Sequence, residues 1–222
     1  MARPPLLIPR PEGLYCPGGD FFIDPARPVA RALITHGHSD HARPGHGAVM
    51  ATRETLDIMA IRYGEDFTRS RQIADGAITI GGVTVSFHPA GHILGSAQIA
   101  VTGGGCRIVV SGDYARVPTP TCARFEPVPC DIFVTEATFA LPVFRHPPPE
   151  TEIARLLASV AAFPDRSHLI GAYALGKAQR LIAALRQAGW DAPIYIHGAL
   201  HQLCDYHVAQ GINLGDLRLA TE

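Results

Sequence analysis

The chain has 222 residues, of which 47% are hydrophobic and 18% are charged, values typical of a globular protein with a buried core. Nineteen basic and 20 acidic residues give a formal net charge of −1, which excludes a strongly polycationic nucleic-acid binder. No apolar run approaches the roughly 20 residues that span a bilayer, and prolines interrupt the N-terminus before a signal-peptide core, so we expect a cytoplasmic chain. The five cysteines form no C-x-x-C pair, so we expect reduced thiols.

Short strands separated by turns are predicted for the first part of the chain. Apolar segments between glycine-rich turns predict strands at residues 14–16, 21–24, 31–35, 48–51, 77–80, 83–88, 96–101 and 107–110. Thr52 is predicted to be the N-cap of a helix that runs to Tyr63 and ends before Gly64. We therefore expect a β-rich layer decorated by helices.

The pattern changes at the proline cluster 147–149. Beyond it, periodicity predicts helices at 153–161, 177–188 and 199–210 and strands at 168–171, which we expect to be buried, and 194–196. We place a domain boundary here, with a first domain at residues 1–146 and a partial α/β domain at 147–222. Two strands make a small sheet that cannot easily bury both faces, so the second domain looks incomplete.

A strongly polar segment follows the predicted strand 31–35. It contains, within six residues, His36, His38, Asp40 and His41. Imidazole nitrogens and carboxylate oxygens are common ligands of zinc and manganese. In an irregular loop the first two histidines can face one ion while Asp40 and His41 face a neighbouring one. The alternative is a solvated polar loop, but three imidazoles would be wasteful there.

Two later segments supply further ligands. His92 lies in a glycine-flanked loop between strands, and Asp113 follows an apolar strand. Each alone is a weak signal, because a single histidine is commonly structural and a Gly-Asp pair is commonly a turn. Together with residues 36–41 they predict a dinuclear centre that Asp113 bridges, because one carboxylate offers two oxygens. A water shared between two cations is readily deprotonated, so we expect hydrolytic chemistry.

The order H-x-H-x-D-H at residues 36–41, then His92, then Asp113 resembles the metallo-β-lactamase superfamily. This resemblance implies an α/β (α+β) fold, the four-layer αββα sandwich, and a cofactor of two zinc ions, with manganese as an alternative. It implies these ligands: for one ion His36, His38 and His92; for the other Asp40 and His41; for both Asp113. Asp24, at the end of a predicted strand, matches the acidic position that orients the metal loop in this family. The alternative is an ordinary strand-end aspartate.

Two later segments resemble the β-CASP branch, which processes nucleic acids. The strand ending in T-E-A-T-F resembles the acidic motif of that branch, with Glu136 as the carried-over residue. The segment G-K-A-Q-R resembles its loop at a helix N-terminus, where the backbone of Gly176 and the side chain of Lys177 would bind a phosphate. A plain turn between helix and strand is the alternative for this second segment.

The whole chain is most similar to the bacterial ligase-associated DNA damage response exonucleases, through residues 13–25, 35–47 and 137–147. This resemblance implies a dinuclear-metal phosphodiesterase, a DNA exonuclease in DNA repair with Asp40, Asp113 and Glu136 as catalytic residues. It favours DNA over RNA as the bound nucleic acid, implies an ATP-dependent DNA ligase and a helicase as further partners, and implies no membrane.

The chain departs from the β-CASP pattern at its end. Two later histidines of that branch would follow Glu222, so we expect either a truncated chain or a substitute for them. His197 and His201 could share a helix face as paired ligands, although a helix start with partly exposed imidazoles is the favoured interpretation. The alternative functions are a small-molecule hydrolase of the same fold, such as a lactonase or thioesterase, and an inactive scaffold subunit.

Overall fold

The computed structural model of the protein describes residues 5–221. They form two compact units, of which the first ends at Glu136 and the second begins at Ala137. The proline cluster at which the sequence pattern changes lies within the second unit, and the domain boundary after residue 146 stays a prediction. Among the described residues, no helix is long and apolar enough to cross a membrane.

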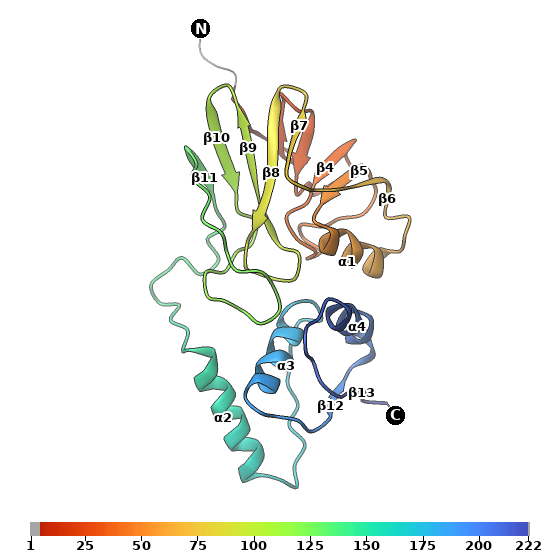
Figure 1. Ribbon diagram of the computed structural model, residues 1–222, viewed down its shortest axis with the longest axis vertical. Helices are drawn as coiled ribbons and strands as arrows, with labels where there is room; N and C mark the ends of the chain where they lie inside the picture. The colour runs from red at the N-terminus through yellow and green to blue at the C-terminus, as the bar shows by residue number, and fades with distance from the viewer. Residues whose placement is uncertain (1–4, 222) are drawn as a thin grey trace. The chain divides into compact units, whose positions relative to one another are not determined.

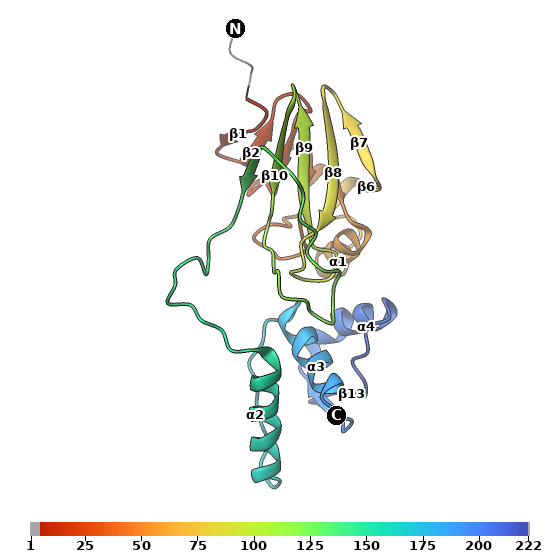
Figure 2. The same ribbon diagram turned by 60° about the vertical axis from the view of Figure 1, so that its left-hand side comes forward.

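Over its described residues, the first unit consists of two sheets and one helix, α1, as Figure 1 also shows. One sheet has six strands in chain order: β1 (Ile8–Arg10), β2 (Gly13–Cys16), β3 (Phe21–Ile23), β4 (Arg31–Leu33), β5 (His46–Ala51) and β6 (Thr68–Ile73). The other has the order β11-β10-β9-β8-β7, with β7 (Ala77–Ile80), β8 (Val83–Pro89), β9 (Ala97–Gly103), β10 (Cys106–Val110) and β11 (Ile132–Val134). Figure 2 shows β7 to β10 side by side. β2 and β3 form an antiparallel hairpin, whereas β3 to β6 pair in parallel.

Strands β4 and β5 are buried on both faces. Leu33 and Met50 contribute to the core between the two sheets. Their neighbours Ala32 and Val49 face the opposite way and pack with α1 (Arg53–Tyr63). Because successive strand residues alternate between faces, this pattern produces two cores on either side of one sheet. Helix, sheet and sheet give three of the four layers predicted for the αββα sandwich within the described residues.

Helix α1 begins and ends as its sequence predicts. Thr52 caps it by accepting a hydrogen bond from the Thr55 backbone N–H at 3.2 Å. Gly64 follows the last turn with a φ of 89°, a conformation that side chains with a Cβ rarely adopt.

Three loops at one end of the two sheets are joined by backbone hydrogen bonds. The loop 36–41 follows β4, the loop containing His92 joins β8 to β9, and Asp113 follows β10. Ala97 donates to the carbonyl of Thr35 at 2.8 Å, and Ala115 donates to the carbonyl of Ala90 at 3.0 Å. The fold therefore brings together the loops that carry the predicted ligands.

The second unit is a small α/β arrangement. Its elements are α2 (Pro149–Ala162), α3 (Lys177–Gln187), β12 (Ile194–Ile196), the 3-10 helix η1 (Gly198–Leu200), α4 (His201–Ala209) and β13 (Leu217–Leu219). β12 and β13 pair in parallel. The buried guanidinium of Arg186 crosslinks this unit by donating to four backbone carbonyls: those of Leu214, Trp190, Ala192 and Asp216.

The predicted buried strand 168–171 is wrong. This segment is irregular in the structure, and Leu169 is 96% exposed. A short apolar segment becomes a strand only when a neighbouring strand accepts its backbone hydrogen bonds, and β12 instead pairs with β13, which the sequence pattern did not predict. The pattern also missed the polar edge strand β6, whose pairing partner is β5.

Candidate metal centre

Four of the predicted ligands converge on one point. One ligand atom from each of His36, His38, His92 and Asp113 lies within 4.8 Å of all the others. His38 Nδ1 is 3.1 Å from His36 Nε2 and 3.2 Å from His92 Nε2. Asp113 Oδ2 is 3.5 Å from His92 Nε2. Three loops thus supply three imidazole nitrogens and one carboxylate oxygen to a single cluster.

A second group of ligand atoms lies on the other side of the same carboxylate. Asp113 Oδ1 is 3.4 Å from His41 Nε2, and that nitrogen is 3.7 Å from Asp40 Oδ2. The side chain of Asp40 is 74% exposed, so this group is open to solvent. One oxygen of Asp113 therefore faces the three-histidine cluster, and the other faces His41.

Asp24 is linked by hydrogen bonds to both groups of ligands, to His41 directly and to His36 through Thr35. Its carboxylate accepts hydrogen bonds from the Thr35 backbone N–H at 2.8 Å, from the Thr35 hydroxyl at 2.6 Å and from His41 Nδ1 at 2.8 Å. Because the Thr35 hydroxyl donates to Asp24, its oxygen must accept from His36 Nδ1, which is 3.0 Å away. Asp24 thereby holds the Nδ1–H form of His41 directly and that of His36 through Thr35. The Nε2 atoms of both rings are left to bind a cation.

His36 and His92 of the first group differ in charge from His41 of the second. Burial and the neighbouring imidazoles hold the pKa of His36 well below its usual value of 6.5, and burial likewise lowers the pKa of His92. Burial also disfavours the charged form of His41, but hydrogen bonds with Asp113 and Asp24 outweigh it and raise its pKa to about 10. The hydrogen bond from His41 lowers the pKa of Asp113 to about 2 despite the opposing effect of burial. In the metal-free protein at neutral pH, His41 is therefore cationic, whereas His36 and His92 are neutral.

The donor set fits a divalent metal ion. Neutral imidazole nitrogens and a bridging carboxylate are ligands that zinc and manganese accept, and each ring whose orientation Asp24 fixes presents an unprotonated or displaceable nitrogen. Three imidazole nitrogens that approach one another this closely offer several lone pairs and few protons to share. A cation at that point would satisfy them.

The remaining predicted residues lie in different places. Glu136 ends the first unit, and its negative charge contributes to the electrostatic environment of His92. The backbone N–H of Gly176 donates to the side-chain oxygen of Gln179 at 2.8 Å, so it already has a partner. Lys177 is exposed, with its ammonium 5.0 Å from the centre of the Tyr173 ring.

The other candidate histidines take no part in the cluster. His197 accepts from the backbone N–H of Ala199 at 3.1 Å, as an N-cap. His201 Nδ1 lies 3.4 Å from Asp205 Oδ2, one helical turn away. Both observations agree with the interpretation of a helix start with partly exposed imidazoles.

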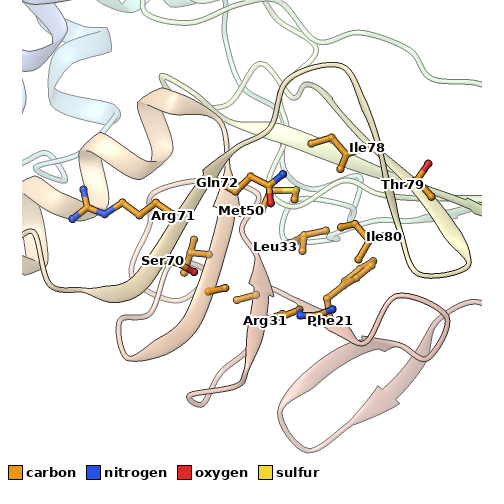
Figure 3. Close-up of a pocket in the computed structure, with 13 residues that line it drawn as sticks. Phe21, Arg31, Leu33, Met50, Ser70, Arg71, Gln72, Ile78, Thr79 and Ile80 are labelled. Carbon is orange, nitrogen blue, oxygen red and sulfur yellow. The ribbon is translucent and has the colours of Figure 1, made fainter.

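A cavity of about 380 Å³ opens elsewhere on the first unit, between β3 to β6 and β7 (Figure 3). Leu33 and Ile80 point toward each other across it, and Arg71 points away from it. Its lining contains none of the predicted ligands. This cavity is a gap at the open edge of the sandwich and not part of the cluster.

Sequence reasoning missed two residues that shape the site. Thr35 relays the hydrogen bond from His36 to Asp24, and its position directly before the H-x-H motif was a signal that could have found it. Ser96 Oγ accepts from the backbone N–H groups of His92 and Ile93, which fixes the turn of that loop.

The chain is similar to several longer nucleic-acid-processing proteins. It is 28% identical over 215 residues to a probable DNA ligase of Opitutus terrae, covering 90% of this chain and 20% of that protein. It is 31% identical over 141 residues to the endoribonuclease ysh1 of Emericella nidulans, covering 57% of this chain and 15% of that protein. It is 25% identical over 222 residues to the transcription termination factor FttA of Thermococcus kodakarensis, covering 80% of this chain and 34% of that protein. The chain thus spans between 15% and 34% of the length of these relatives.

The fold has a counterpart among solved structures. A protein of unknown function from Enterococcus faecalis superimposes with a TM-score of 0.52 at 14% identity, over 78% of this chain and 48% of that one. No family model matches the chain. The predicted α/β fold class and the resemblance to the β-CASP branch of the metallo-β-lactamase superfamily are both confirmed.

Proposed function

We propose that this chain, a relative of the β-CASP metallo-β-lactamase proteins, is a metal-dependent nuclease that hydrolyses phosphodiester bonds. The observation that carries the proposal is the position of Asp113. Its Oδ2 lies 3.5 Å from His92 Nε2 and its Oδ1 lies 3.4 Å from His41 Nε2, so one carboxylate serves two groups of ligands. That arrangement suits a pair of cations that act on one phosphodiester.

The proposed roles follow from the positions of the side chains. One ion would be held by His36, His38, His92 and Asp113, and the second by Asp40, His41 and Asp113. When bound, the two cations would supply the Lewis acidity that activates water and neutralises charge on the phosphoryl oxygens. Asp24 keeps Nε2 of His41 directed at Asp113, and the exposed Asp40 places the second group where a substrate can reach it. Glu136 is the proposed orienting group for a proton donor. Its negative charge acts electrostatically on His92.

The finer proposal is a cytoplasmic DNA exonuclease in DNA repair, using two zinc or manganese ions and working with an ATP-dependent DNA ligase and a helicase. The match that covers 90% of this chain with part of a probable DNA ligase supports DNA as the substrate and a ligase as partner. The matches to an endoribonuclease and a transcription termination factor make RNA the alternative substrate. Gly176 and Lys177 remain the proposed phosphate-binding residues.

The test compares substrates and counts metal. We expect about two ions per chain by elemental analysis. We also expect higher activity on bis-p-nitrophenyl phosphate and labelled DNA than on lactones or thioesters. Asp113→Ala should lose activity and the tight binding of at least one ion, whereas the control His201→Ala, at an exposed position of α4, should retain both. A preference for acyl substrates would assign the chain to the small-molecule hydrolases, and absence of metal from the parent protein would favour a scaffold.

A further inference from the structure

Helix α1 touches the His92 loop at its first turn. The hydroxyls of Thr52 and Thr55 both donate to the carbonyl of Gly95, at 2.7 and 3.1 Å. A Cβ on Gly95 would lie 2.7 Å from Cβ of Glu54 and 2.9 Å from the Thr55 nitrogen, so only glycine permits so close an approach. The loop is thus seated on the start of the helix.

The same helix touches the other histidine loop at its last turn. The guanidinium of Arg62 donates to the carbonyl of Gly37 at 2.7 Å. Gly37 is the residue between His36 and His38, so this carbonyl belongs to the backbone that spaces the two ligands. Arg62 is exposed, and its guanidinium also lies 5.5 Å from the centre of the neighbouring Tyr63 ring.

Short, stiff connections lead from both contacts to the ligands. On one side, Ser96, next to Gly95, accepts from the backbone N–H of His92 at 3.0 Å. On the other, Gly37 is bonded covalently to His36 and His38. Between them, α1 is 11 residues long, or about 16 Å, and its buried face is packed against the sheet. A rigid helix with a hydrogen bond at each end fixes the separation of what it holds.

We propose that α1 is a brace that sets the His36–His38 loop at its distance from the His92 loop, with Thr52, Thr55 and Arg62 as positioning residues for the first metal ion. None of these three side chains belongs to the ligand cluster. Their effect is exerted through the carbonyls of Gly37 and Gly95. The inference rests on the proposed metal centre and adds to it the residues that hold its ligands in register.

The test measures how tightly and in what geometry the first ion binds, without an activity assay. Arg62→Met removes the donor to Gly37, and Arg62→Lys keeps one. Arg53→Met, an exposed arginine in the first turn of the same helix, is the matched control. Hydrogen-bond partners that orient ligands typically contribute about 10- to 100-fold to metal affinity. We therefore expect about tenfold weaker binding in Arg62→Met by chelator competition, a changed visible spectrum of the Co²⁺ form, partial recovery in Arg62→Lys, and parental behaviour in Arg53→Met.

The other end of the brace is tested separately. Thr52→Asp retains an N-cap, because a carboxylate also accepts from the helix N–H groups, but it has no proton to donate to Gly95. Thr52→Ser retains both functions. We expect the Co²⁺ spectrum and affinity to change in Thr52→Asp and not in Thr52→Ser, with the circular dichroism of both unchanged.

Two results would contradict the brace. Parental affinity and an unchanged Co²⁺ spectrum in both Arg62→Met and Thr52→Asp would show that the loops keep their distance without α1. Equal losses in Arg62→Met and Arg53→Met would show an effect of charge alone. In either case the parent protein still binds its ions, and failure of the parent to bind any ion would instead overturn the proposed function.

Discussion

The two proposed ion sites should respond differently to pH. In the metal-free protein the pKa of His41 is about 10, so the second ion must displace a proton from this residue throughout the neutral range. The pKa values of His36 and His92 are lowered, so these ligands of the first ion are already unprotonated at pH 7. Asp113, with a pKa of about 2, is anionic throughout. Proton competition from His41 therefore falls on the second ion, whereas His36, His92 and Asp113 offer no such competition at neutral pH.

The size of the effect follows from the number of protons displaced. Below the pKa of the competing group, loss of one proton per bound ion changes the affinity about tenfold per pH unit. Between pH 7 and 9, the affinity for the second ion should rise about 100-fold, whereas the affinity for the first should change little. The affinity for the second ion rises with pH because His41, with a pKa of about 10, is still protonated between pH 7 and 9. As the proton concentration falls, protons compete less with the ion for this ring.

Stepwise metal titrations against a chromophoric chelator at pH 7, 8 and 9 would measure both affinities. Calorimetry in two buffers of different ionisation enthalpy would count the released proton. His41→Ala is the control, because it should retain one binding step, and that step should vary little with pH. A steep pH dependence of the binding of the first ion, or no pH dependence of the binding of the second, would refute the assignment of His41 to the second ion.

Three further results are expected. Asp24→Asn should lower the pKa of His41 from about 10, because an amide replaces the carboxylate that stabilises the imidazolium; NMR titration of the ring would measure this, and an unchanged value would exclude Asp24 as the cause. Arg186→Met should reduce the free energy of unfolding by roughly 3 kcal/mol or more, because four backbone carbonyls lose a charged donor. Denaturation followed by the fluorescence of the chain's one tryptophan would measure the loss. A loss below about 1 kcal/mol would contradict this prediction. Limited trypsin digestion should cut the irregular segment 166–172 before the first unit, because it is exposed and belongs to no strand; initial cleavage within the β-sheets would count against this.

Local signals were sufficient for the elements of the first unit that carry their own caps and turns. Helix α1 was predictable because threonine is a favoured N-cap and glycine a favoured residue just past a helix end. Thr52 and Gly64 occupy these two positions. The ligand loop was predictable because its residue types have few other uses so close together. The relative positions of its histidines and Asp113 were not derivable from periodicity and came from the resemblance to a family.

Interactions between distant parts of the chain account for what the sequence left out. The segment 168–171 has the composition of a buried strand, but composition does not say which strand will pair with β12. β6 has the opposite character, since it is polar and exposed, yet it is a strand because β5 offers it an edge. In both cases the deciding partner lies many residues away, and no local pattern contains it.

The residues around the ligands are harder to predict from the sequence than the ligands themselves. A ligand must have a particular chemical group, so histidine and aspartate are conspicuous in a sequence. A supporting residue needs only a hydrogen-bond donor in the right place, and many side chains provide one. In the sequence Arg62 is an ordinary arginine, and it is the 2.7 Å contact with the Gly37 carbonyl in the structure that gives it the proposed role. Metal affinity depends on both kinds of residue, because ligands held at the wrong separation must spend binding energy to reach the ion. The decisive comparison is therefore between Arg62 and Arg53, which share a residue type and a helix and differ in what they contact.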